Sequence, residues 1–147
     1  MATNLVIDAS VVIAAVSPSE TGHVEALEFL QLAHASHAVF HEPPQFLLEL
    51  YAVLTRRPRE LRQLGFMIET DPMVLNWTPL GELQVQRLLD WLTLNCPGKC
   101  PTRGADLAYV SSAVEAKLPL VTLDAGLQSF RSCGLDVCAP REFTLRL

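Results

Sequence analysis

The sequence lacks an excess of positive charge. Its 147 residues include 16 Asp and Glu against 11 Lys and Arg, which gives a formal net charge of −5. This balance argues against a broadly basic surface for nucleic acid, because such a surface must neutralise many phosphates. Nucleic acid stays open as a substrate, since a local cluster of basic residues matters more than the overall sum.

A long uninterrupted apolar run is also missing. The longest apolar stretch covers residues 5–16 and is interrupted by Asp8, so it falls well short of the roughly 18–20 residues that a membrane span needs. The N-terminus has no basic start of the kind that a secretory signal carries. Half of the residues are apolar and only 18% are charged, which excludes a disordered chain. We therefore expect a cytoplasmic protein without a membrane segment, folded as a single domain over residues 1–147.

Closely paired cysteines are absent. Three residues lie between Cys96 and Cys100 in the stretch CPGKC, and four lie between Cys133 and Cys138 in CGLDVC. A zinc knuckle usually has two intervening residues, and no histidine lies nearby to complete a site. We therefore expect reduced thiols rather than structural zinc.

Short apolar runs alternate with segments of helical periodicity. Expected strands cover Leu5–Ile7, Ala38–His41, Met73–Trp77, Leu120–Leu123 and Leu135–Cys138. Expected helices lie within Ser10–Val16 and over His23–Ser36, from near Pro44 to before Pro58, over Arg59–Ile68 and Leu83–Leu92, from Thr102 to Lys117, and over Ala125–Arg131. This alternation is typical of α/β proteins. We predict a three-layer α/β/α sandwich with a mostly parallel central sheet.

Four acidic residues are expected at one edge of this sheet. In a parallel sheet with right-handed crossovers, each strand ends and the next helix begins at the same carboxyl edge. Asp8 and Asp124 each follow an expected strand, while Glu49 and Asp106 lie in the early turns of expected helices. Such an edge is where open sheets bind ligands. Several carboxylates in one pocket need a cation or a shared proton, and a carboxylate-rich site suits Mg²⁺ or Mn²⁺.

Simpler roles are open for each acid. Asp8 and Asp124 could cap the helices that follow them, and Asp106 could complement a helix dipole. The Glu49 side chain could extend into solvent. The shared position of all four at one edge favours the common pocket over these separate roles.

The motifs that carry these acids resemble the PIN-domain family, in particular its VapC-type toxin ribonucleases. The stretch VIDASVVIAAV is similar to the family's first strand with its aspartate, and PPQFLLELYAVLTR is similar to its glutamate-bearing helix. The stretch RGADLAYVSSAVEAKLPLVTLD resembles the family's signature of an aspartate in a helix followed by a strand that ends in Thr-x-Asp. LDVCAPREF resembles the final strand and the segment after it. The resemblance spans nearly the whole chain.

The resemblance implies a function and a set of site residues. It implies that Asp8, Glu49, Asp106 and Asp124 bind Mg²⁺ or Mn²⁺ and catalyse endoribonuclease cleavage of RNA. Ser10 and Thr122 match hydroxyl positions beside these acids, where they orient metal, water or carboxylate, or only cap and close turns. The family further implies a homodimer and a small cognate antitoxin that masks the site.

Phosphate contacts need local positive charge, and TRRPRELR is the only dense basic cluster. We expect Arg56, Arg57, Arg59 and Arg62 to bind the RNA backbone, although they could equally stabilise a helix C-terminus. Two other functions are considered. A phosphatase with an aspartyl nucleophile usually has a second acid two residues on, where this chain has Ser10. A non-catalytic, metal-dependent RNA-binding or regulatory module of the same fold is the main alternative.

Overall fold

A computed structural model describes residues 2–147 of the chain. In this part of the chain the sheet has five strands, all parallel, in the order β3-β2-β1-β4-β5. The strands are β1 (Asn4–Ile7), β2 (Val39–Glu42), β3 (Val74–Trp77), β4 (Leu120–Val121) and β5 (Val137–Cys138). The helices are α1 (Ala9–Val16), α2 (His23–Ala35), α3 (Gln45–Leu54), α4 (Pro58–Thr70), α5 (Glu82–Asn95), α6 (Leu107–Ala116), α7 (Ala125–Gln128) and α8 (Pro140–Thr144), with the 3-10 turns η1 (Gly104–Asp106) and η2 (Ser129–Cys133).

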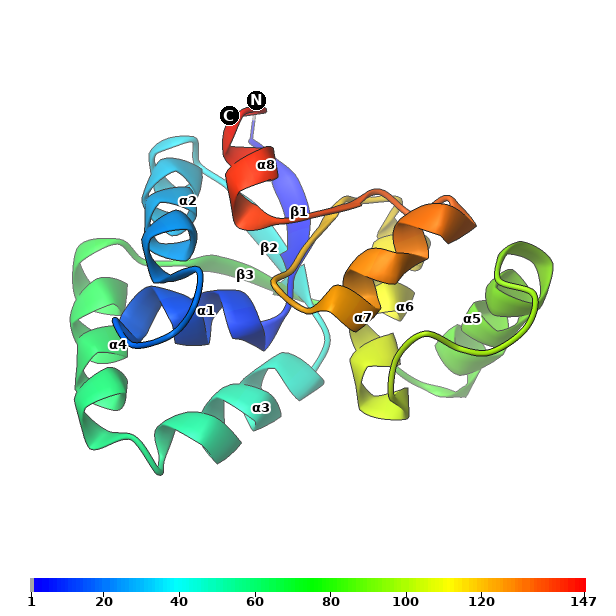
Figure 1. Cartoon of the computed structure of the whole chain (residues 1–147), viewed down its shortest axis with the longest axis horizontal. Coiled ribbons are helices and arrows are strands. Elements are labelled where there is room, and N and C mark those ends of the chain that lie inside the picture. Colours follow the sequence, from blue (N-terminus) through cyan, green and yellow to red (C-terminus); the bar gives the residue numbers. More distant parts are fainter. Residues whose placement is uncertain (1) are drawn as a thin grey trace.

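Helices cover both faces of the sheet (Figure 1). α6 packs against β1, β2 and β4 on one face, and α5 packs on α6. On the other face α1 contacts α2, α3 and α4. Right-handed crossovers explain this division, because the chain moves in one direction from β1 to β3 and then returns past β1 to β4. The predicted three-layer α/β/α sandwich is therefore confirmed.

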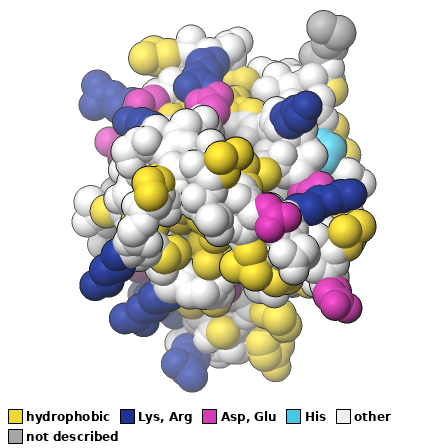
Figure 2. All heavy atoms as spheres, turned by 90° about the vertical axis from the view of Figure 1, so that its right-hand side faces the viewer, with side chains coloured by type: hydrophobic (Ala, Val, Ile, Leu, Met, Phe, Trp, Pro, Cys, Tyr) yellow, Lys and Arg dark blue, Asp and Glu magenta, His cyan; other side chains and the backbone are white. Residues whose placement is uncertain are grey.

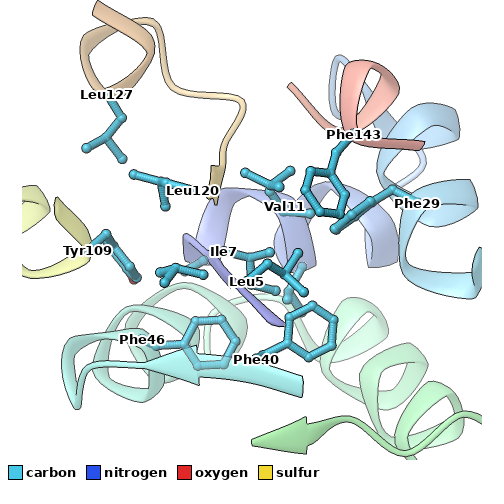
Figure 3. Packing of buried hydrophobic residues seen from close by; sticks show 14 of the residues in the cluster. Leu5, Ile7, Val11, Phe29, Phe40, Phe46, Tyr109, Leu120, Leu127 and Phe143 are labelled. Carbon is cyan, nitrogen blue, oxygen red and sulfur yellow. The ribbon is translucent and has the colours of Figure 1, made fainter. Parts of the chain in front are cut away.

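β1 forms the centre of the core. Its residues Leu5, Val6 and Ile7 have no exposed surface, because helices cover both faces of this strand. A strand buried on both faces carries apolar residues at successive positions instead of alternate ones. Figure 3 shows Leu5 and Ile7 packed between Val11 of α1 and the ring of Phe40. This buried strand ends at Ile7 and leads directly into Asp8.

The order of the elements follows the sequence prediction, with two differences. The helix expected from Thr102 begins at Leu107, because residues 104–106 form the turn η1. The C-terminal segment, for which we predict no helix, forms α8, and the ring of Phe143 meets that of Phe29 in α2 edge to face at 5.8 Å. No helix within residues 2–147 is both long and apolar enough to cross a membrane.

The prediction of reduced cysteines is wrong for one pair. Cys96 at the end of α5 and Cys133 at the end of η2 form a disulfide, with their Cα atoms 5.3 Å apart. Thirty-seven residues separate the two, so the local spacing of cysteines gives no sign of the pairing. Cys100 and Cys138 are free thiols in the described chain. The disulfide ties the loop before η1 to the segment that follows α7.

Candidate active site

The carboxyl end of β1 lies where the strand order changes direction. The chain passes from β1 to β2 on one side, whereas β4 and β5 lie on the other side. In open parallel sheets, ligands bind in the crevice outside the carboxyl ends of the strands at such a point. In Figure 1 this edge is at the lower end of β1, near the starts of α1, α3 and α7. All four predicted acids belong to segments that reach this edge.

Asp8 is the most deeply buried of these acids, with 5% of its surface exposed. Its carboxylate accepts hydrogen bonds from the hydroxyls of Thr122, at 2.7 Å, and Ser10, and from the Ser10 N–H at 3.1 Å. Burial is the main reason that the pKa of Asp8 is raised to about 6. The two hydroxyl bonds act against this rise, and the charges of Glu49 and Asp124 add to it.

Asp124 is joined to Asp8 through a hydroxyl group. Its N–H donates to Oγ1 of Thr122 at 2.9 Å, and the same hydroxyl donates to the Asp8 carboxylate. The Asp124 side chain also accepts from the Gly126 N–H at 3.1 Å and so caps α7, while Asp8 caps α1. Helix capping and membership of a shared pocket are therefore compatible, because each carboxylate has more than one acceptor site.

Glu49 lies in the middle of α3 and is half-buried. Its Oε2 accepts a hydrogen bond from the phenol of Tyr109 in α6 at 2.7 Å, and Tyr109 has no exposed surface. Burial raises the pKa of Glu49, the bond from Tyr109 lowers it, and the charges of Asp106 and Asp124 raise it further. Burial and the bond to Glu49 raise the pKa of Tyr109, so the phenol stays a neutral donor at ordinary pH.

Asp106 ends η1, directly before α6. Its Oδ2 accepts a hydrogen bond from the Thr102 hydroxyl at 3.0 Å. The loop that contains Thr102 packs closely on the start of α7. A Cβ atom at Gly126 would lie 3.3 Å from that hydroxyl and 3.2 Å from the carbonyl oxygen of Pro101. This close approach brings the Asp106 segment beside the segment that carries Asp124.

Asp8, Glu49, Asp106 and Asp124 thus form one electrostatic group, which we call the acidic cluster. The pKa shifts of Asp8 and Glu49 both depend on the charges of other cluster members. Within residues 2–147, no member of the cluster forms an ion pair with a basic side chain. Carboxylates that repel one another without a basic partner take up a proton or bind a cation.

The acidic cluster has the donor chemistry of a site for a hard divalent cation. Mg²⁺ and Mn²⁺ favour oxygen ligands, and the cluster offers carboxylates from four segments. The side chains do not form a closed cage: in the described chain, no three Asp, Glu, His or Cys side chains are grouped closely enough to hold a metal ion. The residues therefore fit the ion in kind, and binding requires the carboxylates to turn towards one another.

The arginines predicted to bind RNA lie apart from the acids, around the corner between α3 and α4. Arg57 donates a hydrogen bond to Glu20 at 2.9 Å, and the two residues form an ion pair. Arg56, Arg59 and Arg62 are exposed and form no ion pair in the part of the chain that the structure describes. The structure brings none of the four into contact with the acidic cluster.

Three residues at this edge have no role in the prediction from the sequence. Tyr109 holds Glu49, and its position three residues after Asp106 was the available signal. Glu42 ends β2 and is fully buried; the rule about strand ends that identifies Asp8 applies to it as well. Arg103 is exposed and lies three residues before Asp106, but it stands outside the dense basic cluster.

The fold has counterparts among solved structures. A chain of VapBC2 from Rickettsia felis, crystallised with a DNA fragment from the promoter, aligns with a TM-score of 0.63 and 13% identity over 92% of this chain and 97% of that chain. PAE2754 from Pyrobaculum aerophilum aligns with a TM-score of 0.61 and 15% identity, covering 99% and 97%. FitAcB from Neisseria gonorrhoeae aligns with a TM-score of 0.58 and 16% identity, covering 92% and 97%.

The sequence matches no family model and no curated protein. The structural likeness nevertheless extends over almost the full length of this chain and of each counterpart. Within residues 2–147 this chain has an all-parallel five-stranded sheet with helices on both faces. The chain therefore has a PIN-like fold.

Proposed function

We propose that the chain is a Mg²⁺- or Mn²⁺-dependent endoribonuclease that cleaves RNA phosphodiester bonds and acts as the toxin of a toxin–antitoxin pair. One observation supports the proposal: four carboxylates from four separate segments lie at the edge where the strand order changes direction and influence one another's charge, without a basic partner in the described chain. The PIN-like fold supports it, and so does the origin of VapBC2 and FitAcB in toxin–antitoxin systems.

Each residue of the site has a role in this proposal. The acidic cluster would hold the cation, which, when bound, supplies an acidified water and offsets negative charge on the scissile phosphate. Ser10 and Thr122 donate to Asp8 and set the direction of its carboxylate. Tyr109 does the same for Glu49.

Cleavage of purified total RNA tests this proposal. The wild-type protein is expected to cut RNA with Mg²⁺ or Mn²⁺ and to stop when EDTA is added. Asp8→Asn should abolish cleavage and leave the fold intact, since asparagine also caps helices. A protein that binds Mn²⁺ and RNA but leaves the RNA uncut would contradict the nuclease and favour the non-catalytic RNA-binding module.

Exposed arginines are the proposed contacts to the RNA backbone. Charge reversal of Arg56 and Arg62 should weaken RNA binding and reduce its salt dependence, because each phosphate contact releases counterions. Arg103→Glu should have a similar effect, since Arg103 precedes Asp106 by three residues. Mn²⁺ affinity should stay unchanged in all three variants. Unchanged RNA affinity, measured by fluorescence anisotropy at two salt concentrations, would remove this role.

We propose that the antitoxin binds along α3. A groove of about 490 Å³ between α3 and α4 is almost entirely apolar. Its walls include Val12, Phe46, Leu50, Leu54, Leu64 and Ile68. α3 also carries Glu49, so an antitoxin segment in this groove could extend a basic residue into the acidic cluster. Leu47→Lys, at the exposed margin of the groove, should release inhibition by a co-expressed antitoxin while RNA cleavage persists.

A homodimer and a cytoplasmic location complete the proposal. Figure 2 views the side of the molecule that carries α5, and hydrophobic side chains are visible on its surface. The α5 side chains that are exposed and apolar are Leu83, Val85, Leu89 and Leu94. A second copy would cover such a surface. Cytoplasmic thiols are usually kept reduced, so a count of the free thiols in protein taken from cells tests the location. A cytoplasmic protein should have Cys96 and Cys133 reduced, whereas an intact Cys96–Cys133 disulfide would contradict this location.

A further inference from the structure

Glu42, the last residue of β2, has no exposed surface. Its Oε1 accepts a hydrogen bond from the Ile7 N–H at 2.7 Å, while its Oε2 has no hydrogen-bond partner within residues 2–147. Burial raises the pKa of Glu42 well above its ordinary value, the Ile7 bond lowers it, and the charge of Asp8 raises it. An apolar side chain at such a position is often less costly to the fold.

The path of the backbone explains why Ile7 needs this acceptor. Pairing between β1 and β2 ends at Leu5 and Phe40, whereas β2 continues to pair with β3 as far as Glu42. The pairing of β1 with β2 therefore ends before Ile7, which still pairs with Val121 of β4. The Ile7 side chain lies deep in the core (Figure 3). A buried N–H without a partner is costly. The Glu42 carboxyl group takes the place of the missing β2 carbonyl.

This bond fixes the chain directly before Asp8. On the β2 side, Glu42 holds the Ile7 N–H. On the β4 side, the carbonyl of Val121 holds the N–H of Asp8 at 3.2 Å. The end of β1 is thus held from both sides, at the position from which the Asp8 carboxylate reaches the hydroxyl of Thr122.

We propose that Glu42 is a positioning residue for the acidic cluster: its buried oxygen holds the Ile7 N–H and thereby places Asp8 where the other three acids can share a cation with it. This role requires an acceptor oxygen as far from the backbone as that of a glutamate side chain, and it does not require a negative charge. Glutamine supplies that oxygen, methionine has a similar volume without it, and aspartate is one methylene too short. The inference rests on the cation site of the proposed function.

Mn²⁺ binding by the full chain, measured with MnCl₂ by calorimetry well below each melting temperature, tests this role. Glu42→Gln should bind Mn²⁺ within about threefold of the wild-type affinity, while Glu42→Met and Glu42→Asp should bind at least about tenfold more weakly, a loss typical of residues that orient metal ligands. Thermal melts separate weaker binding from lost stability. If the methionine variant does not fold, the aspartate variant carries the comparison.

Ser17→Ala is the matched control. Ser17 is also polar and fully buried, but it follows the opposite end of α1, where it donates to Glu60 at 3.3 Å. Its loss should lower the melting temperature and leave Mn²⁺ affinity unchanged. A drop in affinity equal to that of Glu42→Met would show that any buried polar loss disturbs the cluster, and would overturn the specific role of Glu42.

Two further results would overturn the inference. One is a folded Glu42→Met protein with wild-type Mn²⁺ affinity, and the other is Glu42→Gln as weak as Glu42→Met, since the charge would then matter. A wild-type protein that does not bind Mn²⁺ contradicts the proposed function instead. Amide hydrogen exchange then decides the inference: the Ile7 N–H should exchange at least about tenfold faster in Glu42→Met than in the wild type or Glu42→Gln, and equal rates overturn it.

Discussion

The acidic cluster and the C-terminal segment contain carboxylates in opposite surroundings. Near the C-terminus, Asp136 pairs with Arg146 and Glu142 pairs with Arg131, each at 2.9 Å and each exposed. The pKa of Glu142 is lowered by the backbone N–H at the start of α8 and by Arg131. In the cluster, the pKa of Asp8 is raised to about 6, and only hydroxyl and N–H groups donate to its carboxylate.

This contrast separates acids that stabilise the fold from acids that destabilise it. The C-terminal ion pairs, Asp136–Arg146 and Glu142–Arg131, are complete, although exposed pairs of this kind contribute only about 0–1 kcal/mol each. The acidic cluster has no basic partner in the described chain, and its mutual repulsion and burial oppose folding. A bound cation would therefore add more stability at the acidic cluster than at the C-terminal ion pairs.

Neutralising one acid in each region should give the largest difference. Asp124→Asn is expected to lower the rate of RNA cleavage by at least about a hundredfold, the usual loss when one preorganised electrostatic group is removed from an active site. Asp136→Asn should leave the rate within about twofold, since it removes only an exposed ion pair. Initial rates with Mn²⁺ measure both. Equal rates for the two variants would contradict the assignment of the active site.

The second effect concerns the stability of the metal-free protein. The pKa of Asp8 is about 6 in the folded chain against an ordinary 3.8, so the folded state keeps a proton that the unfolded state loses. Stability should therefore fall as the pH rises from about 4 to about 6, by up to about 3 kcal/mol for this residue. Glu42 and Glu49 add to the fall, because burial also raises their pKa.

Asp8→Asn removes this cost and should raise metal-free stability at pH 7 by about 1–3 kcal/mol. Urea unfolding in EDTA at pH 4 and pH 7 measures the change, with Asp136→Asn as the control. The wild type should also bind Mn²⁺ more tightly as the pH rises through about 6, because the ion requires an ionised Asp8. If the free energy of unfolding of Asp8→Asn depends on pH in the same way as that of the wild type, the Asp8 carboxyl group is not desolvated in the folded chain.

A smaller effect is expected at Tyr109. Tyr109→Phe removes only the hydroxyl that donates to Glu49, and we expect Mn²⁺ to bind about tenfold more weakly, as when other ligand-orienting bonds are lost. Tyr51→Phe is the control, because Tyr51 lies on α3, the helix of Glu49, two residues after that glutamate, and is largely exposed. Calorimetry should show no change for this control. Equal affinities in both variants would assign the phenol to packing alone.

The smallest effect belongs to the C-terminal ion pairs. Glu142→Gln removes an exposed charge that pairs with Arg131, and it should lower the free energy of unfolding by less than about 1 kcal/mol. Thermal melts at low and high salt measure this, and the difference from the wild type should shrink in high salt. A larger, salt-independent loss would mean that the two regions differ less than their surroundings indicate.

The sequence predicted the fold because its signals are local. Apolar runs of strand length alternate with helical periodicity, and this alternation is sufficient for a parallel sheet between two helical layers. The helix start at Thr102 was wrong, since η1 intervenes before α6. The shared sheet edge of Asp8 and Asp124 was expected from the strand ends, and the resemblance to the PIN-domain family implied a hydroxyl at Thr122 beside these acids. The metal-binding role of the acids stays a prediction.

The remaining features depend on contacts between distant segments. The Cys96–Cys133 disulfide joins residues whose spacing along the chain carries no signal. Arg57 was predicted to bind the RNA backbone, but it forms an ion pair with Glu20, which is 37 positions away in the sequence. The bond from Tyr109 to Glu49 spans sixty residues of sequence. Each of these depends on how helices pack, and packing is a property of the assembled core.

By itself, the sequence determined where the strands of the described chain lie. It followed that acids after parallel strands share one edge, because strand direction and crossover handedness leave few alternatives. Only the tertiary structure decided how those acids are held. Burial is the main cause of the raised pKa of Asp8. The pairing of β1 with β2 ends before Ile7, and Glu42 therefore becomes the acceptor for the Ile7 N–H. Desolvation and hydrogen-bond partners exist only once the segments have packed together.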